Sequence, residues 1–326
     1  MNYRLTIFLL IIFGFSIWAF SGDSFIPKEH PDGPAYNPQP ALLSNFVSPV
    51  FVAFSGDENM VPKRNWLIPN IETGAKSALA ISFDGKRIYY EKNSRTRLPM
   101  ASLTKLMTAL VVAENYDLDR VFTVLPAALT REGERGDLRS YEKITARSLL
   151  AMMLVESSND AAMVLAQNLP EKMEKNSANS FSDFMNLMNQ KAWELELNDT
   201  HFDNPDGLDS PTHYSSAFDL SNLFRYLLTR HSWLREYLKN QNMVVYSADG
   251  KIQHRLKNSN DLLGRIPEVE AGKTGFTDNA GGSLILFTSG FGDFDRGIIT
   301  VILGSDDRFG ESEKLINWLR SAYIWQ

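Results

Sequence analysis

From residue 77 onward the hydrophobic positions follow two periods, one typical of strands and one typical of helices. Two strand-like runs, residues 77–83 and 87–91, flank the Asp84-Gly85 dipeptide, which is a strong hairpin signal. Apolar residues at helical spacing predict helices over residues 103–113, 144–155, 161–169, 181–197 and 220–228. The strand period returns over residues 268–274, 283–288 and 298–304, before a last helix predicted over 313–323. This order predicts one mixed α/β domain whose first and last strands share a sheet.

The first 70 residues differ from the rest. Residues 5–20 form an uncharged apolar run after Arg4, which is typical of a secretion signal. At ~1.5 Å per residue the run covers roughly 24 Å of a ~30 Å hydrocarbon core, so a cleaved signal and an uncleaved anchor both stay open. Residues 21–70 hold eight of the 14 prolines and predict an extended linker. We expect an export segment at 1–20, a linker at 21–70 and one folded domain at 71–326, located in the cell envelope outside the cytoplasm.

Composition excludes several classes of protein. The 326 residues include 44% hydrophobic residues, enough for a substantial core. The net charge of −6 and the lack of a Lys/Arg cluster argue against a nucleic-acid partner. The absence of cysteine excludes disulfides, thiolate catalysis and cysteine-based metal sites. No metal-ligand spacing is present either, so we expect neither a metal nor a cofactor.

The first candidate motif is Ser102-Leu103-Thr104-Lys105, at the start of a predicted helix. Residues three apart share a helix face, so the Lys105 amine can reach the Ser102 hydroxyl. The positive end of the helix dipole stabilises an alkoxide at Ser102 and destabilises an ammonium at Lys105. A serine nucleophile with a neutral lysine as its base requires both effects. The same spacing recurs at Ser140 and Lys143, next to the charged stretch 131–139, which is typical of a solvated loop. Ser102, followed by an apolar helix, is the better candidate.

The second motif, Ser157-Ser158-Asn159, falls in a predicted turn between two apolar helices. A hydroxyl at residue 157 can relay a proton, and the Asn159 amide can hold both a lysine and a substrate carbonyl. Serine and asparagine are also common helix caps, so a purely structural role stays open for this tripeptide.

The third motif, Lys273-Thr274-Gly275, lies in a predicted strand. The glycine permits close approach of a ligand backbone, while Lys273 and Thr274 can bind an anionic terminus. Taken alone, the tripeptide fits an exposed strand end equally well. The three motifs together indicate a serine acyl-transfer site. His201 and His213 could belong to a Ser-His-Asp triad or bind a metal, but no metal-ligand spacing accompanies them, and we expect a structural role for both.

The chain resembles the serine-type D-Ala-D-Ala carboxypeptidases, low-molecular-mass penicillin-binding proteins of peptidase family S11 in the β-lactamase/penicillin-binding-protein superfamily. Their signature is S-x-x-K, S-x-N and K-T-G in this order. The resemblance covers about residues 71–326, and Ser158 replaces a glycine usual in the second motif. It includes further segments, at residues 100–105, 157–162, 201–208, 213–220, 272–277 and 280–282.

The resemblance implies a five-stranded antiparallel sheet flanked by helices, with a helical subdomain that carries the second motif. It also implies the catalytic roles: Ser102 is the acylated nucleophile, Lys105 its base and Ser157 a proton relay. Asn159 clamps the substrate, and Lys273 and Thr274 hold its C-terminal carboxylate. The substrate-binding set is completed by Gly275, Phe276 and Thr277, with the backbone N–H groups of Ser102 and Phe276 forming an oxyanion hole worth ~3 kcal/mol per donor.

Two features depart from the family pattern. Phe276 stands where many relatives have histidine, and the charged stretch 131–139 differs from the usual loop before the second motif. We expect a carboxypeptidase that removes the terminal D-alanine from peptidoglycan stem peptides, with β-lactams as covalent inhibitors and a membrane contact through residues 5–20. The alternatives are an endopeptidase, a β-lactamase and a non-catalytic wall-binding protein.

Overall fold

A computed structural model describes residues 61–130, 132–133, 136–170, 180–292 and 297–325. The predicted export segment and most of the predicted linker lie outside these residues. The main element is a five-stranded antiparallel sheet in the order β3-β2-β10-β9-β8. Its strands are β2 (Ser77–Ser82), β3 (Ile88–Lys92), β8 (Val269–Thr277), β9 (Gly281–Thr288) and β10 (Ile298–Ser305). The predicted first hairpin and the predicted last three strands therefore do share one sheet.

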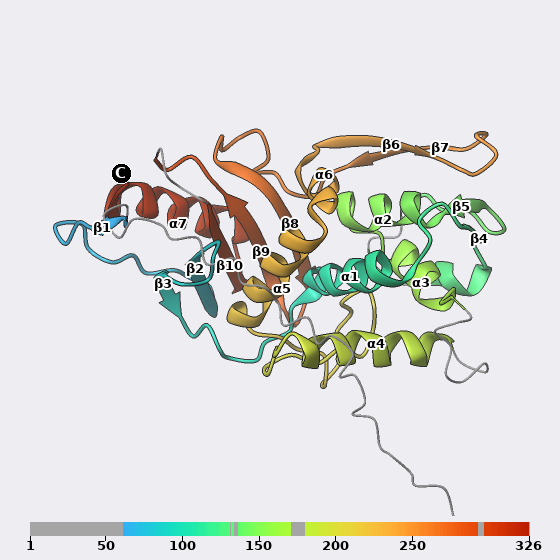
Figure 1. The fold of residues 1–326 in the computed structure, drawn as a ribbon, viewed down its shortest axis with the longest axis horizontal. Coiled ribbons are helices and arrows are strands. Elements are labelled where there is room, and N and C mark those ends of the chain that lie inside the picture. The colour runs from blue at the N-terminus through green and yellow to red at the C-terminus, as the bar shows by residue number, and fades with distance from the viewer. Residues whose placement is uncertain (1–60, 131, 134–135, 171–179, 293–296, 326) are drawn as a thin grey trace, which may run out of the picture. The chain divides into compact units, whose positions relative to one another are not determined.

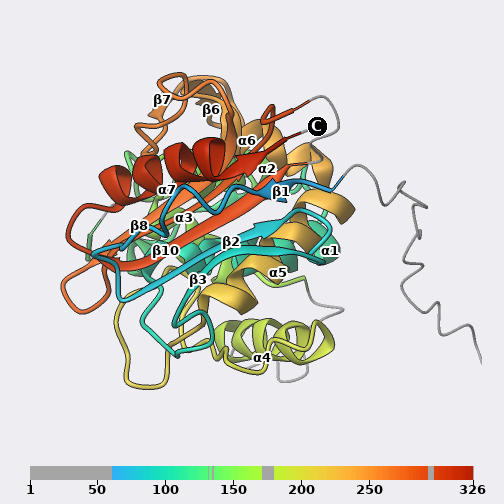
Figure 2. The same ribbon diagram turned by 90° about the vertical axis from the view of Figure 1, so that its left-hand side faces the viewer.

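Helices cover both faces of this sheet (Figure 2). Alternate residues of β2 point to opposite faces: Ala78 and Ala80 pack in a cluster with helix α7 (Arg308–Ala322), whereas Leu79 and Ile81 belong to the main core. On that second face lies helix α5 (Ala217–Arg230), which contacts both β2 and β10. Because both faces are covered, the central strands β2, β9 and β10 are buried along nearly their whole length, unlike strands with one solvent-exposed face.

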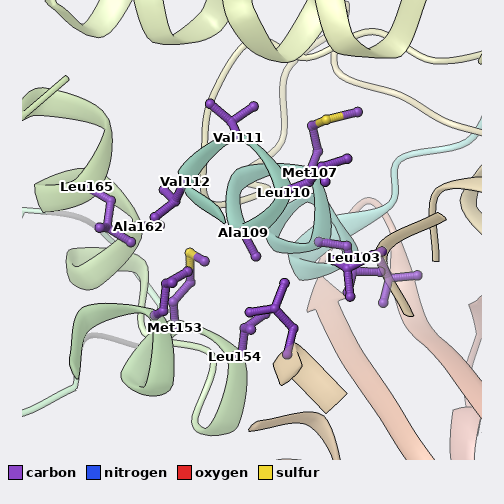
Figure 3. Close-up of a cluster of buried hydrophobic side chains, with 14 of the residues drawn as sticks. Leu103, Met107, Ala109, Leu110, Val111, Val112, Met153, Leu154, Ala162 and Leu165 are labelled. Atoms are coloured by element: carbon purple, nitrogen blue, oxygen red, sulfur yellow. The ribbon is translucent and has the colours of Figure 1, made fainter. Parts of the chain in front are cut away.

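Beyond the sheet lies a helical region (Figure 1). It contains α1 (Lys105–Asn115), α2 (Ala146–Val155), α3 (Asn159–Gln167) and α4 (Ser180–Glu194). Helix α1 is buried on nearly all sides, and Leu110 and Val112 lie in one apolar cluster with Met153 of α2 and Leu165 of α3 (Figure 3). Strand β8 contacts the turn just before α1. The first motif therefore lies where the sheet meets the helices.

Several short elements were not predicted. They are the strand pairs β1 (Lys63–Arg64) with β11 (Tyr323–Ile324), β4 (Val121–Thr123) with β5 (Lys143–Thr145) and β6 (Asn242–Tyr246) with β7 (Gln253–Lys257), the helix α6 (Arg235–Lys239), and the 3-10 turns η2 (Ala101–Thr104), η3 (Pro126–Thr130) and η5 (Ser232–Leu234). The helix predicted from residue 144 begins only at Ala146. Thr145 ends strand β5 instead and caps α2, its Oγ1 accepting a hydrogen bond from the Ser148 N–H at 3.1 Å.

The last residues of the predicted linker are packed against the C-terminal segment. Lys63 and Arg64 pair with Ile324 and Tyr323, and the Trp318 indole N–H donates to the Pro69 carbonyl at 2.8 Å. These contacts tie the first described residues to α7. Among the residues that the structure describes, none of the helices is both long enough and apolar enough to span a bilayer.

Candidate active site

The first motif begins in the 3-10 turn η2 and continues into α1. Ser102 is partly exposed, whereas Lys105 is fully buried. Ala101, just before the serine, has a φ of +49°, a strained conformation for a residue with a side chain. Gly207 lies against this turn so closely that a Cβ there would come within 2.0 Å of the Ala101 carbonyl oxygen. The neighbouring segment can therefore pack this closely against the backbone before Ser102 only because residue 207 is glycine.

The Lys105 amine connects three segments. Its Nζ lies 2.6 Å from Ser102 Oγ, 2.7 Å from Asn159 Oδ1 and 2.7 Å from the Asp206 carbonyl oxygen. The Asn159 Nδ2 donates to the Glu132 carbonyl at 2.5 Å, which fixes the amide so that its oxygen faces the lysine. Glu132 belongs to the charged stretch that departs from the family pattern. This stretch was predicted to be a solvated loop, and its Glu132 backbone reaches the site.

These partners suit a lysine that changes its protonation state. The Asn159 and Asp206 oxygens can only accept hydrogen bonds, so they take two N–H groups of Lys105 in either state. As an ammonium, Lys105 donates its third N–H to Ser102 Oγ. As a neutral amine, it points its lone pair at the same hydroxyl and can accept the hydroxyl proton. The geometry therefore allows proton transfer between Ser102 and Lys105 without any rearrangement of the lysine.

The second motif occupies the turn between α2 and α3, as predicted. Ser158 is the helix cap, because its Oγ accepts from the Ala161 N–H at 3.1 Å. Ser157 has a φ of +68°, and its Oγ lies 2.9 Å from Lys273 Nζ. Asn159 turns the other way, to Lys105. One serine thus fills the structural role considered from sequence, while its two neighbours meet the lysines of the other motifs.

The third motif lies in β8, as predicted. Lys273 is 1% exposed, and its Nζ donates to Ser157 Oγ and, at 3.1 Å, to the Thr274 carbonyl. The Thr274 hydroxyl lies 2.5 Å from Ser259 Oγ. A Cβ on Gly275 would come within 2.9 Å of the Ser102 backbone nitrogen. The β8 backbone therefore passes directly beside the nitrogen that the resemblance assigns to an oxyanion hole.

The two residues after this motif lie at the rim. Phe276 is 60% exposed, and the Thr277 hydroxyl donates to Asp209 Oδ1 at 2.7 Å. The structure thus brings together Ser102, Lys105 and Asn159 by one set of hydrogen bonds, and Ser157 and Lys273 by another. The close approach of Gly275 to Ser102 joins the two sets into one site.

Sequence reasoning missed four contributors to this site. The side chains of Ser259 and Asp209 contact Thr274 and Thr277, and the backbone carbonyls of Asp206 and Glu132 contact Lys105 and Asn159. Asp206 lies in a segment already noted for its resemblance to the family, which was a usable signal. Ser259 carries no such signal. The second serine–lysine pair with the spacing of the first motif, Ser140 and Lys143, is exposed, and Lys143 lies in β5.

His213 has a structural position beneath the first motif. Its Nδ1 accepts from the Asp203 N–H at 3.0 Å, and its Nε2 lies 2.7 Å from Thr104 Oγ1. Because the Thr104 hydroxyl donates to the Ala101 carbonyl at 2.8 Å, it accepts from a protonated Nε2. Burial lowers the pKa of His213 to about 4, so the ring stays neutral near pH 7. His213 therefore braces the turn that carries Ser102.

His201 has a separate environment, with its Nδ1 2.7 Å from the Thr212 carbonyl oxygen. Among the described parts of the chain, no group of three or more His, Cys, Asp or Glu side chains is arranged to hold a metal ion.

Comparisons with known proteins agree with this geometry. A family model described as D-alanyl-D-alanine carboxypeptidase, Peptidase S11, matches residues 64–307. The D-alanyl-D-alanine carboxypeptidase DacF of Bacillus subtilis is 34% identical over 63% of this chain and 52% of its own length. The D-alanyl-D-alanine endopeptidase of Pseudomonas aeruginosa is 30% identical over 78% of this chain and 79% of its own. The chain thus spans about half the length of the first relative and more of the second.

Solved structures show the same fold. The Streptomyces K15 DD-transpeptidase superposes with a TM-score of 0.70 at 26% identity, over 77% of this chain and 98% of the other. Penicillin-binding protein D2 from Listeria monocytogenes, solved in a cefotaxime-bound form, gives a TM-score of 0.65 at 28% identity, with coverages of 77% and 98%. On the family match and these relatives, the chain belongs to the D-alanyl-D-alanine carboxypeptidase family, Peptidase S11.

Proposed function

We propose that this protein is a serine carboxypeptidase that removes the terminal D-alanine from peptidoglycan stem peptides. The observation that carries the proposal is the position of Lys105 Nζ, 2.6 Å from Ser102 Oγ and 2.7 Å from Asn159 Oδ1. A serine hydroxyl beside a buried amine with two fixed acceptors is the arrangement that an acyl-transfer nucleophile needs.

The proposed reaction has two steps. Ser102 Oγ attacks the carbonyl carbon of the penultimate D-alanine, and its proton passes to Lys105. The C–N bond to the terminal D-alanine breaks, and the leaving nitrogen receives a proton through the Ser157 hydroxyl. Water then attacks the Ser102 ester, which releases the shortened peptide and restores the hydroxyl. The same serine attacks the strained amide of a β-lactam, which makes these drugs covalent inhibitors.

Substrate binding is assigned to the third motif and its neighbours. The buried Lys273 and the Thr274 hydroxyl suit the terminal carboxylate of the peptide, since a charged donor strengthens such a hydrogen bond. The Asn159 side chain is assigned two contacts, one with Lys105 and one with the substrate. The backbone N–H groups of Ser102 and Phe276 form the oxyanion hole, made possible by Gly275. Phe276 and Thr277 line the rim where the rest of the stem peptide leaves the site.

An endopeptidase that cuts peptide cross-links is the second candidate. The match with the Pseudomonas aeruginosa endopeptidase supports it, because the chain covers 79% of that relative. Both reactions use the same acyl-enzyme and differ in the leaving group, which is free D-alanine in one and a second stem peptide in the other.

Substrate and N-terminal sequence together support a location outside the cytoplasm. Peptidoglycan lies there, and the apolar run 5–20 has the pattern of an export signal or an anchor. We assign the membrane contact to this run.

The test is D-alanine release from a synthetic pentapeptide that ends in D-Ala-D-Ala. Wild-type protein and a Ser140→Ala variant release D-alanine at equal rates, whereas Ser102→Ala abolishes release. Release that survives Ser102→Ala contradicts the proposal. Digestion of cross-linked muropeptides, followed by mass spectrometry, separates the two candidates: cross-link cleavage at a rate comparable with D-alanine release supports the endopeptidase.

A further inference from the structure

The hairpin formed by β6 and β7 has two faces of different character. It packs on α2 in the helical region (Figure 1). On its inner face, Leu256 belongs to the main core, and His254 is buried with its Nε2 2.7 Å from Glu142 Oε1. These contacts fix the hairpin to the body of the protein. The outer face can therefore be changed without disturbing the core.

The outer face exposes apolar and aromatic side chains. In the ladder, Val244 pairs with Arg255 and Tyr246 pairs with Gln253, so these residues lie on one face. Val244 is 46% exposed and Tyr246 is 49% exposed, although both are large and apolar. Tyrosine combines an apolar ring with a hydroxyl, a side chain well suited to a surface that binds a partner.

Two cations lie on the same face. Arg255 and Lys257 are both exposed and two residues apart in β7, which spaces them about 7 Å apart along the strand. Within the described ranges, neither forms an ion pair, whereas Lys251 at the hairpin tip lies 3.5 Å from Asp249. The chain as a whole has a net charge of −6. This face is therefore a cationic surface on an acidic protein, complementary to an anionic partner.

The chain leads from the hairpin directly to the candidate active site. Strand β7 ends at Lys257, and two residues later the Ser259 N–H donates to the Val155 carbonyl at 3.1 Å. The Ser259 hydroxyl contacts Thr274, the residue assigned to the substrate carboxylate. A polymer with one end group at Thr274 can thus reach the hairpin by following this strand.

We propose that Val244, Tyr246, Arg255 and Lys257, here termed the hairpin face, bind the polymeric peptidoglycan strand on which the enzyme acts. This inference rests on the proposed function. Each repeat of the polymer carries an acidic stem peptide, and Arg255 and Lys257 pair with carboxylates of stems next to the one in the active site. Val244 and Tyr246 pack on the apolar faces of its sugar rings. Two contacts on one polymer raise the effective concentration of the end group at Ser102.

The test is sedimentation of the full-length protein in detergent with insoluble, purified peptidoglycan. Ser102→Ala is present throughout to prevent turnover. The double variant Arg255→Glu/Lys257→Glu is expected to bind about fivefold more weakly or worse, and raised salt is expected to weaken the parent but hardly the variant. Tyr246→Ala provides a second, uncharged disruption with a smaller loss. The matched control, Lys76→Glu/Lys86→Glu, makes the same change in net charge at exposed positions just before β2 and in the turn between β2 and β3, and is expected to bind within twofold of the parent.

Enzymes with Ser102 intact provide the kinetic readout. The double variant lowers the ratio of D-alanine release from the polymer to release from a short pentapeptide, while the control leaves that ratio unchanged. Equal polymer binding by parent and double variant overturns the inference, even if D-alanine is released normally. If the control variant binds peptidoglycan as weakly as the double variant, the loss of binding follows net charge alone, and this result overturns the inference too. Charge-dependent binding by a protein that releases no D-alanine overturns the proposed function but supports the hairpin face.

Discussion

The Nζ of Lys105 lies 2.7 Å from Oδ1 of Asn159, although the two residues are 54 positions apart in the chain. This hydrogen bond joins the first motif on α1 to the second motif at the start of α3. It also decides where the amine points, because the Asn159 amide is itself fixed by the Glu132 carbonyl. The position of the proposed base therefore depends on a residue from another helix.

Replacing Asn159 tests this dependence. Asn159→Ala removes one of the fixed acceptors that orient the Lys105 amine. We expect the rate of penicillin acylation to fall by about 10²-fold, since misplacing a catalytic group has effects of this size. Stopped-flow acylation measures the rate. Asn168→Ala, at the other end of α3, is the control and should acylate at the wild-type rate; equal rates for both variants contradict the role of Asn159.

Gly207 tests the support of the nucleophile turn. It has a φ of +92°, and a Cβ there would lie 2.0 Å from the Ala101 carbonyl oxygen. Gly207→Ala combines backbone strain of about 1–3 kcal/mol with a steric clash against the peptide before Ser102. We expect the rate of D-alanine release to fall far more than the decrease in the free energy of unfolding can explain. Both are measured on the same preparation.

Gly250→Ala provides the matched comparison for Gly207. Gly250 has a φ of +72°, yet nothing lies within 4 Å of the Cβ position. This variant incurs the conformational strain without the clash, so it should lose some stability and keep full activity. Equal activities in the two alanine variants contradict the idea that Gly207 positions Ser102.

Ser259 tests the binding of the substrate carboxylate. Its hydroxyl lies 2.5 Å from that of Thr274 and orients it. Ser259→Ala is expected to raise KM for the pentapeptide by about twofold to tenfold, the value of one hydrogen bond, and to leave kcat within twofold. Steady-state kinetics with Ser321→Ala as the surface control measure both constants. A fall in kcat with unchanged KM contradicts a binding role.

His213 gives the protein a specific dependence on pH. Burial lowers its pKa to about 4, below the ordinary value of 6.5, so the unfolded chain takes up the proton first. The contribution to stability is complete above pH 6.5 and is lost as the pH falls from 6.5 to 4, by on the order of 3 kcal/mol. Urea unfolding at pH 7.5, 6.5, 5.5 and 4.5 measures this loss. His213→Gln, which keeps a donor for Thr104, should flatten the curve over that interval; an unchanged curve refutes the assignment.

The large elements of the fold were predictable because their periodicity is long and strong. The buried strands β9 and β10 and the helices of the middle region all carry apolar residues in regular spacing. The short ladders were not predictable, since two or three residues such as Lys63 and Arg64 become a strand only when a distant segment, here Tyr323 and Ile324, lies beside them.

The candidate site divides in the same way. Three motifs in order were readable because their side chains are chemically distinctive. The contacts of Lys105 with the Asp206 carbonyl and of Asn159 with the Glu132 carbonyl were not, since every residue has a carbonyl group and only the fold decides which one is near. The second motif shows the converse: its sequence left both chemistry and helix capping open, and the structure gives the cap to Ser158, whose Oγ accepts from the Ala161 N–H.

The most direct test of the account is peptide mapping by mass spectrometry after reaction with benzylpenicillin. The account predicts one intact penicillin added to the peptide that contains Ser102, and no addition in Ser102→Ala. An adduct on any other serine, such as Ser157 or the exposed Ser140, would contradict the account.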